Sequence, residues 1–384
     1  MKAREFAILL LKRIFLSKDS FVIFAGAAAF YLVFYAWPYW NQIITHIPTA
    51  IVDLDRSAQS RSLTSALQAA PSIDLRAVVH DMSDGDTIFR SGQVAVLIVI
   101  PENFAKDTNR AKPTAITVYS DGAYPAKGRA VYASVLAVCQ AENIVNAIRY
   151  VLINGGDAQA AKRLANAGLP FVSQDLFNEI AGYGLYTVSM VVVVILQSVI
   201  FFGTAVVLGG CLQEGNANAI ACAMRSNRRF IWTTLAVFSA IAFFWGLFIE
   251  GIGMWLLNMP SMGCAPSTIL SLTLFSVSVS SFAIMVTFML RGNLYAAMTF
   301  IPMSAPSVFM TGLIYPSSEF PLWAKTIAFF FPSTPGASAI LFSSQQGAPA
   351  WDLVPLYFWL IVQIALFSAG IWYFSKRALK RLPN

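Results

Sequence analysis

Apolar and polar stretches divide this chain into one apolar span, a long polar stretch and five further apolar spans. The first span covers residues 20–39 and the polar stretch covers residues 40–182. Each span holds about the 20 apolar residues that a helix needs to cross a bilayer core. Helices are expected because a backbone in lipid must satisfy its own hydrogen bonds. The pattern predicts a polytopic α-helical membrane protein with six transmembrane helices, the last five at residues 183–209, 230–257, 267–290, 294–314 and 353–374.

A short segment, residues 1–19, precedes the first span. On a helix, Phe6, Leu9, Leu10 and Ile14 would share one arc, because successive residues turn by about 100°. Several basic side chains would lie on the other side, although the division is incomplete. This partial pattern predicts a cytoplasmic helix lying against the membrane surface, with a simple extension of the first span as the alternative.

Short β-branched runs alternate with helical patterns through the polar stretch. The clearest strand is VAVLIVI at residues 94–100, a continuous run suited to a buried strand. Other strands are expected at residues 49–54, 75–79 and 115–119, with helices at 57–70, near 84, near 104, at 125–153 and at 157–167. Alternating strands and helices predict a small α/β domain inserted between the first and second spans.

Basic residues gather in the segments that six crossings would place on one side of the membrane. The acidic residues in these segments are Glu5, Asp19 and Glu214. The basic residues are far more numerous: Lys2, Arg4, Lys12, Arg13, Lys18, Arg225, Arg228, Arg229, Arg291, Lys376, Arg377, Lys380 and Arg381. The positive-inside rule makes this side cytoplasmic, with both termini on it and the inserted domain extracytoplasmic. The net charge of +7 is therefore explained by membrane topology and does not indicate nucleic-acid binding.

Residue types that carry catalysis or bind metals are sparse in this chain. His46 and His80 are its only histidines, and its four cysteines show no metal-ligand spacing. No G-x-x-x-x-G-K-[ST] motif occurs, so the chain has no phosphate-binding loop of that kind. The sequence predicts neither an enzyme nor a cofactor site.

A few polar residues in the predicted spans are candidates for a transport path. Glu250 is the only carboxylate well inside a span, although it is close enough to the outer end to reach the membrane surface. Gln197 lies mid-span and needs a partner on another helix. Ser271 and Ser278 belong to a face of hydroxyls that suits either close helix packing or a weakly polar path.

Two prolines in the fifth span, Pro302 and Pro306, are candidates for a gate. Proline frees backbone carbonyls and favours kinks, although it is also common in membrane helices that merely pack. The scarcity of charge in the spans suggests a hydrophobic or amphipathic cargo, because an ion path ordinarily needs more buried charge or carbonyl coordination.

Three segments of the inserted domain have a recognisable sequence: IPTAIVDLDRSAQSRSL at residues 47–63, SGQVAVLIVIPENFAKD at 91–107 and ITVYSDGAYP at 116–125. They resemble the outer domain of the ABC type-2 export permeases, the membrane subunits of ATP-binding-cassette exporters. The segment GLIYPSSEFPLWAKTIAFFFPSTPG at residues 312–336 is similar to the family's sequence before the last span. The resemblance implies that two short helices near residues 315–336 dip into the membrane from outside.

The same resemblance implies a docking loop for an ATPase in the first inner loop. Glu214 and Gly215 match the family's acidic, Gly-Thr-containing pattern, whereas Asn216 stands where threonine is usual and the preceding basic-acidic run is absent. An ordinary cytoplasmic loop is the alternative. The implied partners are a cytoplasmic ABC ATPase that binds ATP and Mg, a second permease in a homodimer or heterodimer, membrane lipid, and a periplasmic adaptor protein in Gram-negative bacteria.

The leading hypothesis is a permease subunit that exports a drug-like or lipid-like molecule across the bacterial inner membrane. An ion-coupled secondary transporter is one alternative, but it would be expected to have several buried carboxylates and repeated halves. A receptor or assembly scaffold that binds partners through the inserted domain is another. A bound ATPase whose hydrolysis depends on this chain would distinguish the first hypothesis from the other two.

Overall fold

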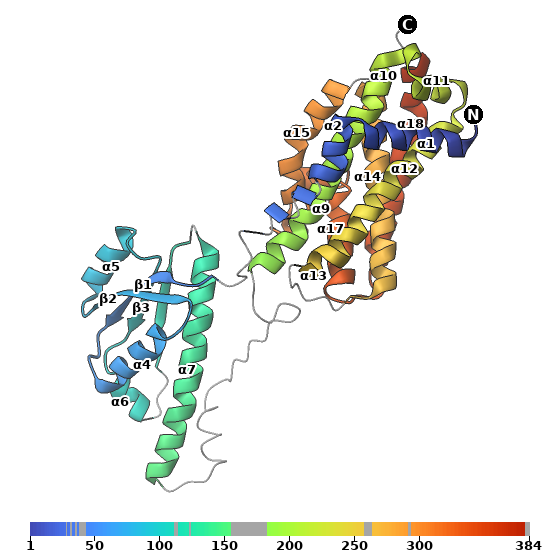
Figure 1. Cartoon of the computed structure of the whole chain (residues 1–384). Helices are drawn as coiled ribbons and strands as arrows, with labels where there is room; N and C mark the ends of the chain where they lie inside the picture. The colour runs from blue at the N-terminus through green and yellow to red at the C-terminus, as the bar shows by residue number, and fades with distance from the viewer. Residues whose placement is uncertain are drawn as a thin grey trace. The chain divides into compact units, whose positions relative to one another are not determined.

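The computed structural model describes residues 1–27, 29–30, 33–34, 37, 44–110, 114–122, 124–154, 183–256, 263–290 and 293–380. The chain forms two compact units (Figure 1). A helical unit joins Met1–Trp40 to Gly184–Asn384, and an α/β unit comprises Asn41–Tyr183. The helix predicted at residues 157–167 and part of the first predicted span (residues 28, 31–32, 35–36 and 38–39) lie outside the described residues.

Long apolar helices build the helical unit (Figure 1). Four stretches of the described residues are long and apolar enough to cross a membrane: Met190–Ala217, Arg229–Leu256, Ala265–Leu290 and Val354–Lys380. They correspond to the predicted second, third, fourth and sixth spans. Their main helices are α9 (Tyr183–Thr204), α12 (Arg229–Phe248), α14 (Ala265–Leu290) and α18 (Val354–Lys380).

The predicted fifth span is a helix, α15 (Asn293–Met310), which continues through Pro302 and Pro306. It is not among the four most apolar stretches. Two prolines, an asparagine and several hydroxyl side chains lower its hydropathy. The described residues therefore contain four candidate spans, or five if a bent helix pair is counted as one, and six spans are not established.

The bent pair consists of α16 (Leu322–Ala328) and α17 (Ser333–Ser344), whose axes differ by 75°. We call it the re-entrant pair, because a bend of this kind in an apolar segment is typical of a broken span or a re-entrant loop. The pair extends to Ser344, well past the end predicted at residue 336. Pro335 lies in the first turn of α17, where proline is tolerated because the N–H that it lacks has no partner within the helix.

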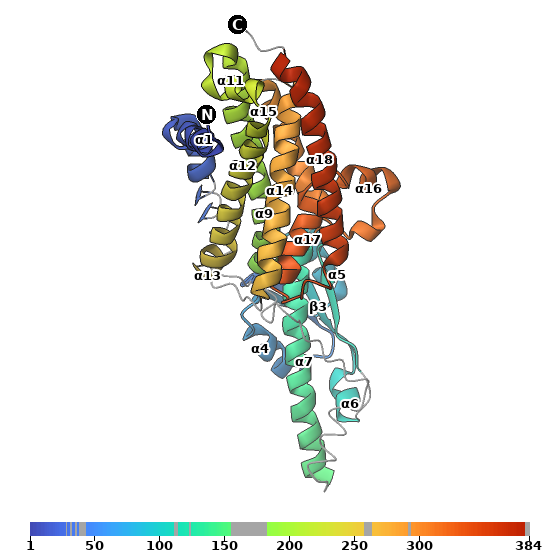
Figure 2. The same cartoon turned by 90° about the vertical axis from the view of Figure 1, so that its right-hand side faces the viewer.

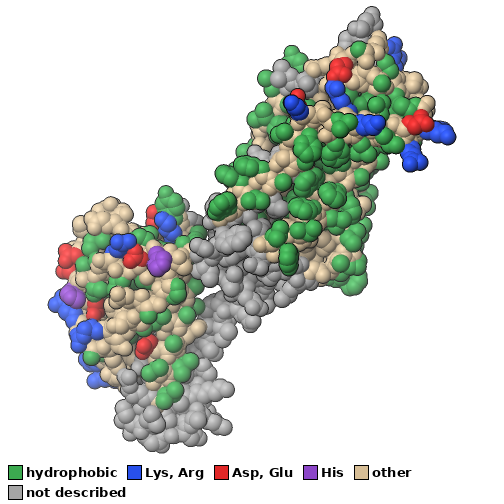
Figure 3. Space-filling model, in the orientation of Figure 1, with side chains coloured by type: hydrophobic (Ala, Val, Ile, Leu, Met, Phe, Trp, Pro, Cys, Tyr) green, Lys and Arg blue, Asp and Glu red, His purple; other side chains and the backbone are tan. Residues whose placement is uncertain are grey.

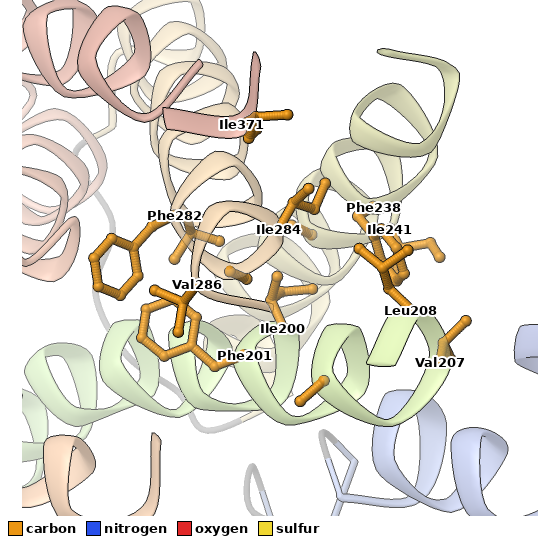
Figure 4. Close-up of a cluster of buried hydrophobic side chains, with 14 of the residues drawn as sticks. Ile200, Phe201, Val207, Leu208, Phe238, Ile241, Phe282, Ile284, Val286 and Ile371 are labelled. Atoms are coloured by element: carbon orange, nitrogen blue, oxygen red, sulfur yellow. The ribbon is translucent and has the colours of Figure 1, made fainter. Parts of the chain in front are cut away.

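Helix α14 lies at the centre of the helical unit, between α12, α17 and α18 (Figure 2). Figure 4 shows the apolar side chains packed around it. The Phe201 ring lies 4.5 Å from Phe300 and 5.2 Å from Phe282, measured between centroids. Phe282 in turn contacts Phe367 of α18 at 5.0 Å. Aromatic packing therefore joins four helices at one level.

The N-terminal segment forms α1 (Ala3–Leu16), followed by a break at Ser17 and by α2 (Lys18–Phe21). Helix α1 lies crosswise on the bundle near α12 (Figures 1 and 2). Phe6, Leu10 and Ile14, part of the predicted apolar arc, are fully buried, and the Phe6 ring stacks on Phe230 of α12 at 4.6 Å. This arc packs against protein. A location at the membrane surface stays a prediction.

The α/β unit contains a four-stranded sheet in the order β2-β1-β3-β4. Strands β1 (Ile47–Asp53), β2 (Ile73–Val79) and β3 (Val96–Ile100) are parallel, and β4 (Thr117–Ser120) runs antiparallel to β3. All four strands occur close to their predicted positions. The buried, β-branched β1 and β3 form the sheet's centre, as expected for strands covered on both faces.

Helices cover both faces of this sheet. One face packs on α4 (Ala58–Gln68), α6 (Phe104–Asn109) and α7 (Pro125–Asn154), through residues such as Ile51, Leu63 and Val131. The other face packs on α5 (Met82–Arg90) through Ala50, Val52 and Leu97. Alternate residues of β1 thus point into two separate apolar layers.

Candidate functional sites: the re-entrant pair and the loop of the basic end

Two buried glutamines contact the break between α16 and α17. Gln363 of α18 donates from Nε2 to the carbonyl oxygens of Phe329, at 2.6 Å, and Phe331, at 3.2 Å. Gln197 of α9 accepts through Oε1 from the backbone N–H of Ser333 at 2.8 Å. The two side-chain amides thus form hydrogen bonds with carbonyls just after α16 and with an N–H at the start of α17. A helix break in a membrane needs such partners, because no water is available for its backbone groups.

Neighbouring side chains hold Gln363 in this position. Ser278 of α14 donates its hydroxyl to Gln363 Oε1 at 3.0 Å, and the Trp359 indole N–H donates to the Phe329 carbonyl at 3.2 Å. Gln197, Ser278 and Gln363 are each at most 1% exposed. In this arrangement Gln197 and Ser278, both candidates for a transport path, contact the re-entrant pair or the residue that binds it.

Hydroxyl groups surround the C-terminal end of α17. Ser343 donates to the Ser271 hydroxyl at 3.2 Å, and the hydroxyls of Ser271 and Tyr357 lie 3.0 Å apart. Tyr357 also donates to the carbonyl oxygen of Ser267 at 3.2 Å. Ser271, the third polar path candidate, is fully buried here. Its contacts join α14, α17 and α18.

Glu250 lies near the same end of α17. It belongs to a π-helical segment, Ile249–Gly253, that continues α12, and its carboxyl interacts with the side chain of Ser344. Single π-helical turns inside α-helices often occur at functional sites. Glu250 is half-buried. Of the path candidates, it alone is both ionisable and partly exposed.

The candidate gate residues lie within α15, beside two serines that bond to its backbone. The Ser307 hydroxyl donates to the carbonyl oxygens of Met303 and Ser304, each at 2.8 Å. Pro302 and Pro306 remove two N–H donors from this stretch. The carbonyls that lose their usual donors are those of Met298 and Pro302, four residues earlier, whereas the serine hydroxyls bond to other carbonyls of the helix. A gating role for the prolines stays a prediction.

The loop predicted to dock an ATPase connects α10 (Gly210–Glu214) to α11 (Ala219–Ser226) through a short 3₁₀ turn. Gly215 has φ 58° and ψ −128°, a backbone conformation that essentially only glycine adopts. Asn218 caps α11, since its Oδ1 accepts from the N–H groups of Ile220 at 2.8 Å and Ala221 at 3.2 Å. The loop therefore has a defined shape that depends on its sequence.

Glu214 binds partners within the chain. Its carboxylate forms an ion pair with Arg13 of α1 and accepts from Asn218 Nδ2 at 2.6 Å. Asn216 accepts from Arg225 at 2.9 Å through Oδ1. The Glu214 side chain still exposes 44% of its surface, so it remains accessible while it joins α1 to the loop.

The loop lies at an end of the bundle that we call the basic end, formed by α1, α11 and the last turns of α18 (Figures 1 and 2). Figure 3 shows charged side chains gathered there, and apolar side chains over the rest of the helical unit's visible face. Arg228 donates to the Trp372 carbonyl and to the Ser375 hydroxyl, each at 2.8 Å, and so joins the start of α12 to α18. The described candidate spans lead to or from this end.

Comparison with protein families identifies the architecture. The profile of the ABC-2 family transporter proteins matches residues 18–373, which cover both units. The chain belongs to the ABC-2 transporter family. No curated protein sequence matches it significantly. The resemblance inferred from the sequence segments is thereby confirmed at the level of the family.

Membership in the ABC-2 family makes this chain a multi-pass ABC transporter permease. Permeases of the ABC-2 family are membrane subunits that lack their own ATP-binding site, so the family implies an ATPase partner. Among the described residues, no group of three or more His, Cys, Asp or Glu side chains could hold a metal ion.

Sequence reasoning missed two of the main participants in these sites. Gln363 is a polar residue in the middle of an apolar span, the same signal that identified Gln197. Arg13 could not be paired with Glu214 from sequence, because 201 positions separate them. The position of Arg13 inside the apolar arc of α1, on the side that faces protein, was the only available signal.

Proposed function

We propose that this ABC-2 permease exports a hydrophobic or amphipathic molecule across the bacterial inner membrane, driven by a separate cytoplasmic ATPase that binds Mg-ATP. The observation that supports this proposal best is the loop of the basic end. It combines a conformation specific to glycine at Gly215 with an exposed acidic side chain at Glu214. Basic residues mark this end as cytoplasmic by the positive-inside rule.

The ion pair between Arg13 and Glu214 gives the loop a mechanical connection. An ATPase that bound the loop would contact a segment already joined to α1 through Arg13 and to α11 through Asn218. Movement of the loop would then be transmitted to these helices and to α12, against which α1 packs. Such a coupling between separate sites is what ATP-driven transport requires.

The path for cargo is proposed at Glu250, and the gate at Pro302 and Pro306. We assign Gln197, Ser271 and Ser278 to holding the re-entrant pair, because all three are buried and bonded to protein groups in this arrangement. A second permease, identical or related, would complete the path. The α/β unit is proposed to be extracytoplasmic and to receive cargo or bind a periplasmic adaptor protein.

The decisive experiment is purification of the tagged full-length permease from its native membrane, followed by identification of bound proteins. We expect a cassette ATPase whose hydrolysis depends on the permease. Glu214→Arg should reduce its recovery at least tenfold, because the substitution places a cation beside Arg13. Arg61→Glu is a matched control, since this charge reversal changes an exposed side chain of the α/β unit. Recovery of the permease without any ATPase would refute the proposal.

A further inference from the structure

An apolar groove on the helical unit leads toward the basic end. It has a volume of about 350 Å³ and is lined by α14, by α18 and by Phe330 in the break between α16 and α17. The residues that line it are Met285, Phe330, Leu366, Phe367, Ala369, Gly370, Tyr373 and Phe374. Figure 2 shows α18 with α16 beside it. All of the lining side chains are apolar or aromatic, so the groove suits a hydrocarbon chain.

A glycine helps to shape this groove. A Cβ at Gly370 would lie 2.4 Å from the sulfur of Met285. The absence of a side chain at Gly370 thus lets the Met285 side chain of α14 pack directly against the backbone of α18. From Leu366 to Phe374, the groove follows α18 for about 12 Å, given a rise of 1.5 Å per residue. One leaflet of a bilayer core is about 15 Å thick, so the groove matches most of one acyl chain.

A basic side chain stands at the end of the groove. Leu366, Gly370, Tyr373 and Arg377 follow one another at intervals of four, three and four residues, and therefore share one face of α18. The Arg377 guanidinium lies over the Tyr373 ring, 4.5 Å from its centroid. In the described part of the chain, no carboxylate forms an ion pair with Arg377. Its positive charge is thus available to an anion at the level where apolar helix gives way to the basic end.

We propose that this groove binds an anionic phospholipid of the cytoplasmic leaflet, with one acyl chain along α18 and its phosphate at Arg377. Apolar complementarity along the helix and charge complementarity at its end both point to this occupant. Because Phe330 lies in the break between α16 and α17, the bound lipid also contacts and stabilises the re-entrant pair. This site is independent of the ATPase and of the cargo.

Native mass spectrometry of the full-length permease tests the proposal. The protein is released from detergent micelles that contain equal amounts of phosphatidylglycerol and phosphatidylcholine. We expect the wild type to retain phosphatidylglycerol preferentially. Arg377→Gln should reduce this preference about fivefold, because one basic residue contributes about 1 kcal/mol to binding of anionic lipid near the surface. Lys376→Gln is the matched control, since the Lys376 ammonium lies over Trp372, outside the groove.

A second pair of variants tests the acyl chain. Ala369→Phe fills the groove and should abolish retention of both lipids, whereas Ala365→Phe, on an exposed alanine one turn away, should not. Retention of the two lipids in equal amounts by the wild type would overturn the proposal. An equal loss of preference in Arg377→Gln and Lys376→Gln would overturn it too, because the headgroup would then respond only to net charge. Neither result bears on whether an ATPase binds the loop.

Discussion

The two ends of α17 are held by different chemistry. At its N-terminal end, two glutamine amides from α9 and α18 bond to backbone groups of the helix break. At its C-terminal end, the hydroxyls of Ser271, Ser343 and Tyr357 bond to one another and to nearby backbone carbonyl oxygens. A hydroxyl can rotate to a new acceptor, whereas an amide donates and accepts in fixed directions. The N-terminal end is therefore the fixed one, and the C-terminal end can exchange partners as the permease moves.

Gln363→Met should have the largest effect, because it removes three hydrogen bonds while keeping the side chain's volume. At about 0.6 kcal/mol for each bond between membrane helices, the loss is about 2 kcal/mol of stability. Export should fall severalfold as the re-entrant pair loses its position. Thermal unfolding in lipid nanodiscs and a transport assay measure both effects. The control is Gln213→Met, at an exposed glutamine of α10, and equal stability of the two variants would contradict the comparison.

Gln197→Met should have the second largest effect. It removes one bond and leaves the backbone N–H of Ser333 without this partner in a buried position, at a cost of about 1 kcal/mol. The double variant with Gln363→Met should lose less than the sum of the single losses, since both residues hold the same break. Strict additivity in the same unfolding assay would mean that the two glutamines act separately.

Tyr357→Phe should have a smaller effect, about 0.5 kcal/mol, although it removes a hydroxyl with two bonds. Ser271 can turn toward the carbonyl oxygen of Ala339, which lies 3.2 Å away and already accepts from it. Unfolding of this variant beside Gln197→Met compares the two ends of α17 directly. If Tyr357→Phe lost more stability than Gln197→Met, the C-terminal end of α17 would be the fixed end.

Thiol labelling gives the smallest perturbation, because it changes no residue. Cys264 bonds through its N–H to Ser343, at the C-terminal end of α17. Hydrogen bonds from the side chain and backbone of Ser267 lower the pKa of the Cys264 thiol, whereas burial and the nearby Glu142 raise the pKa of Cys139 to about 11. Since thiolate is the reactive form, a membrane-impermeant maleimide at pH 7 should modify Cys264 faster than Cys139.

The same labelling reports on the motion of α17. If the C-terminal end exchanges partners during transport, addition of Mg-ATP to permease reconstituted with its ATPase should change the rate at Cys264 and leave Cys139 unaffected. Mass spectrometry of peptic fragments separates the two sites. Equal labelling rates at both cysteines without nucleotide would contradict the assigned pKa directions. If Mg-ATP does not change the labelling rate at Cys264, the C-terminal end of α17 is as fixed as its N-terminal end.

Much of the fold could be predicted from residue patterns, because each element is specified locally. The run VAVLIVI predicted β3, and Pro125 to Ile153 predicted nearly all of α7. The segment predicted at residues 315–336 came from the family resemblance, and in the structure the second helix of the pair continues to Ser344. Pro335 lies in the first turn of that helix, and Gly336 lies where a Cβ would come within 2.3 Å of the Phe275 ring. Only the tertiary contact with α14 explains that glycine.

The candidate sites were less predictable, because they depend on pairs far apart in the chain. Gln197 was found as a residue in need of a partner, but its partner is a backbone N–H at Ser333. No side-chain pattern identifies such a group. The serine face that includes Ser271 and Ser278 suggested close helix packing or a transport path, but sequence alone could not identify Tyr357 and Gln363 as the partners of these two serines.

The length of α7 has a consequence for the α/β unit's local dynamics. This helix has 30 residues, and among its described side chains those that pack into the apolar layer end at Cys139. Farther along, the described Ile144, Val145 and Ile148 are about half exposed. A helix stretch with little tertiary packing is only marginally stable in water, so amide hydrogens around residues 144–148 should exchange with deuterium far faster than those before Cys139. In energetic terms α7 behaves as a stable helix followed by one that a binding partner could order.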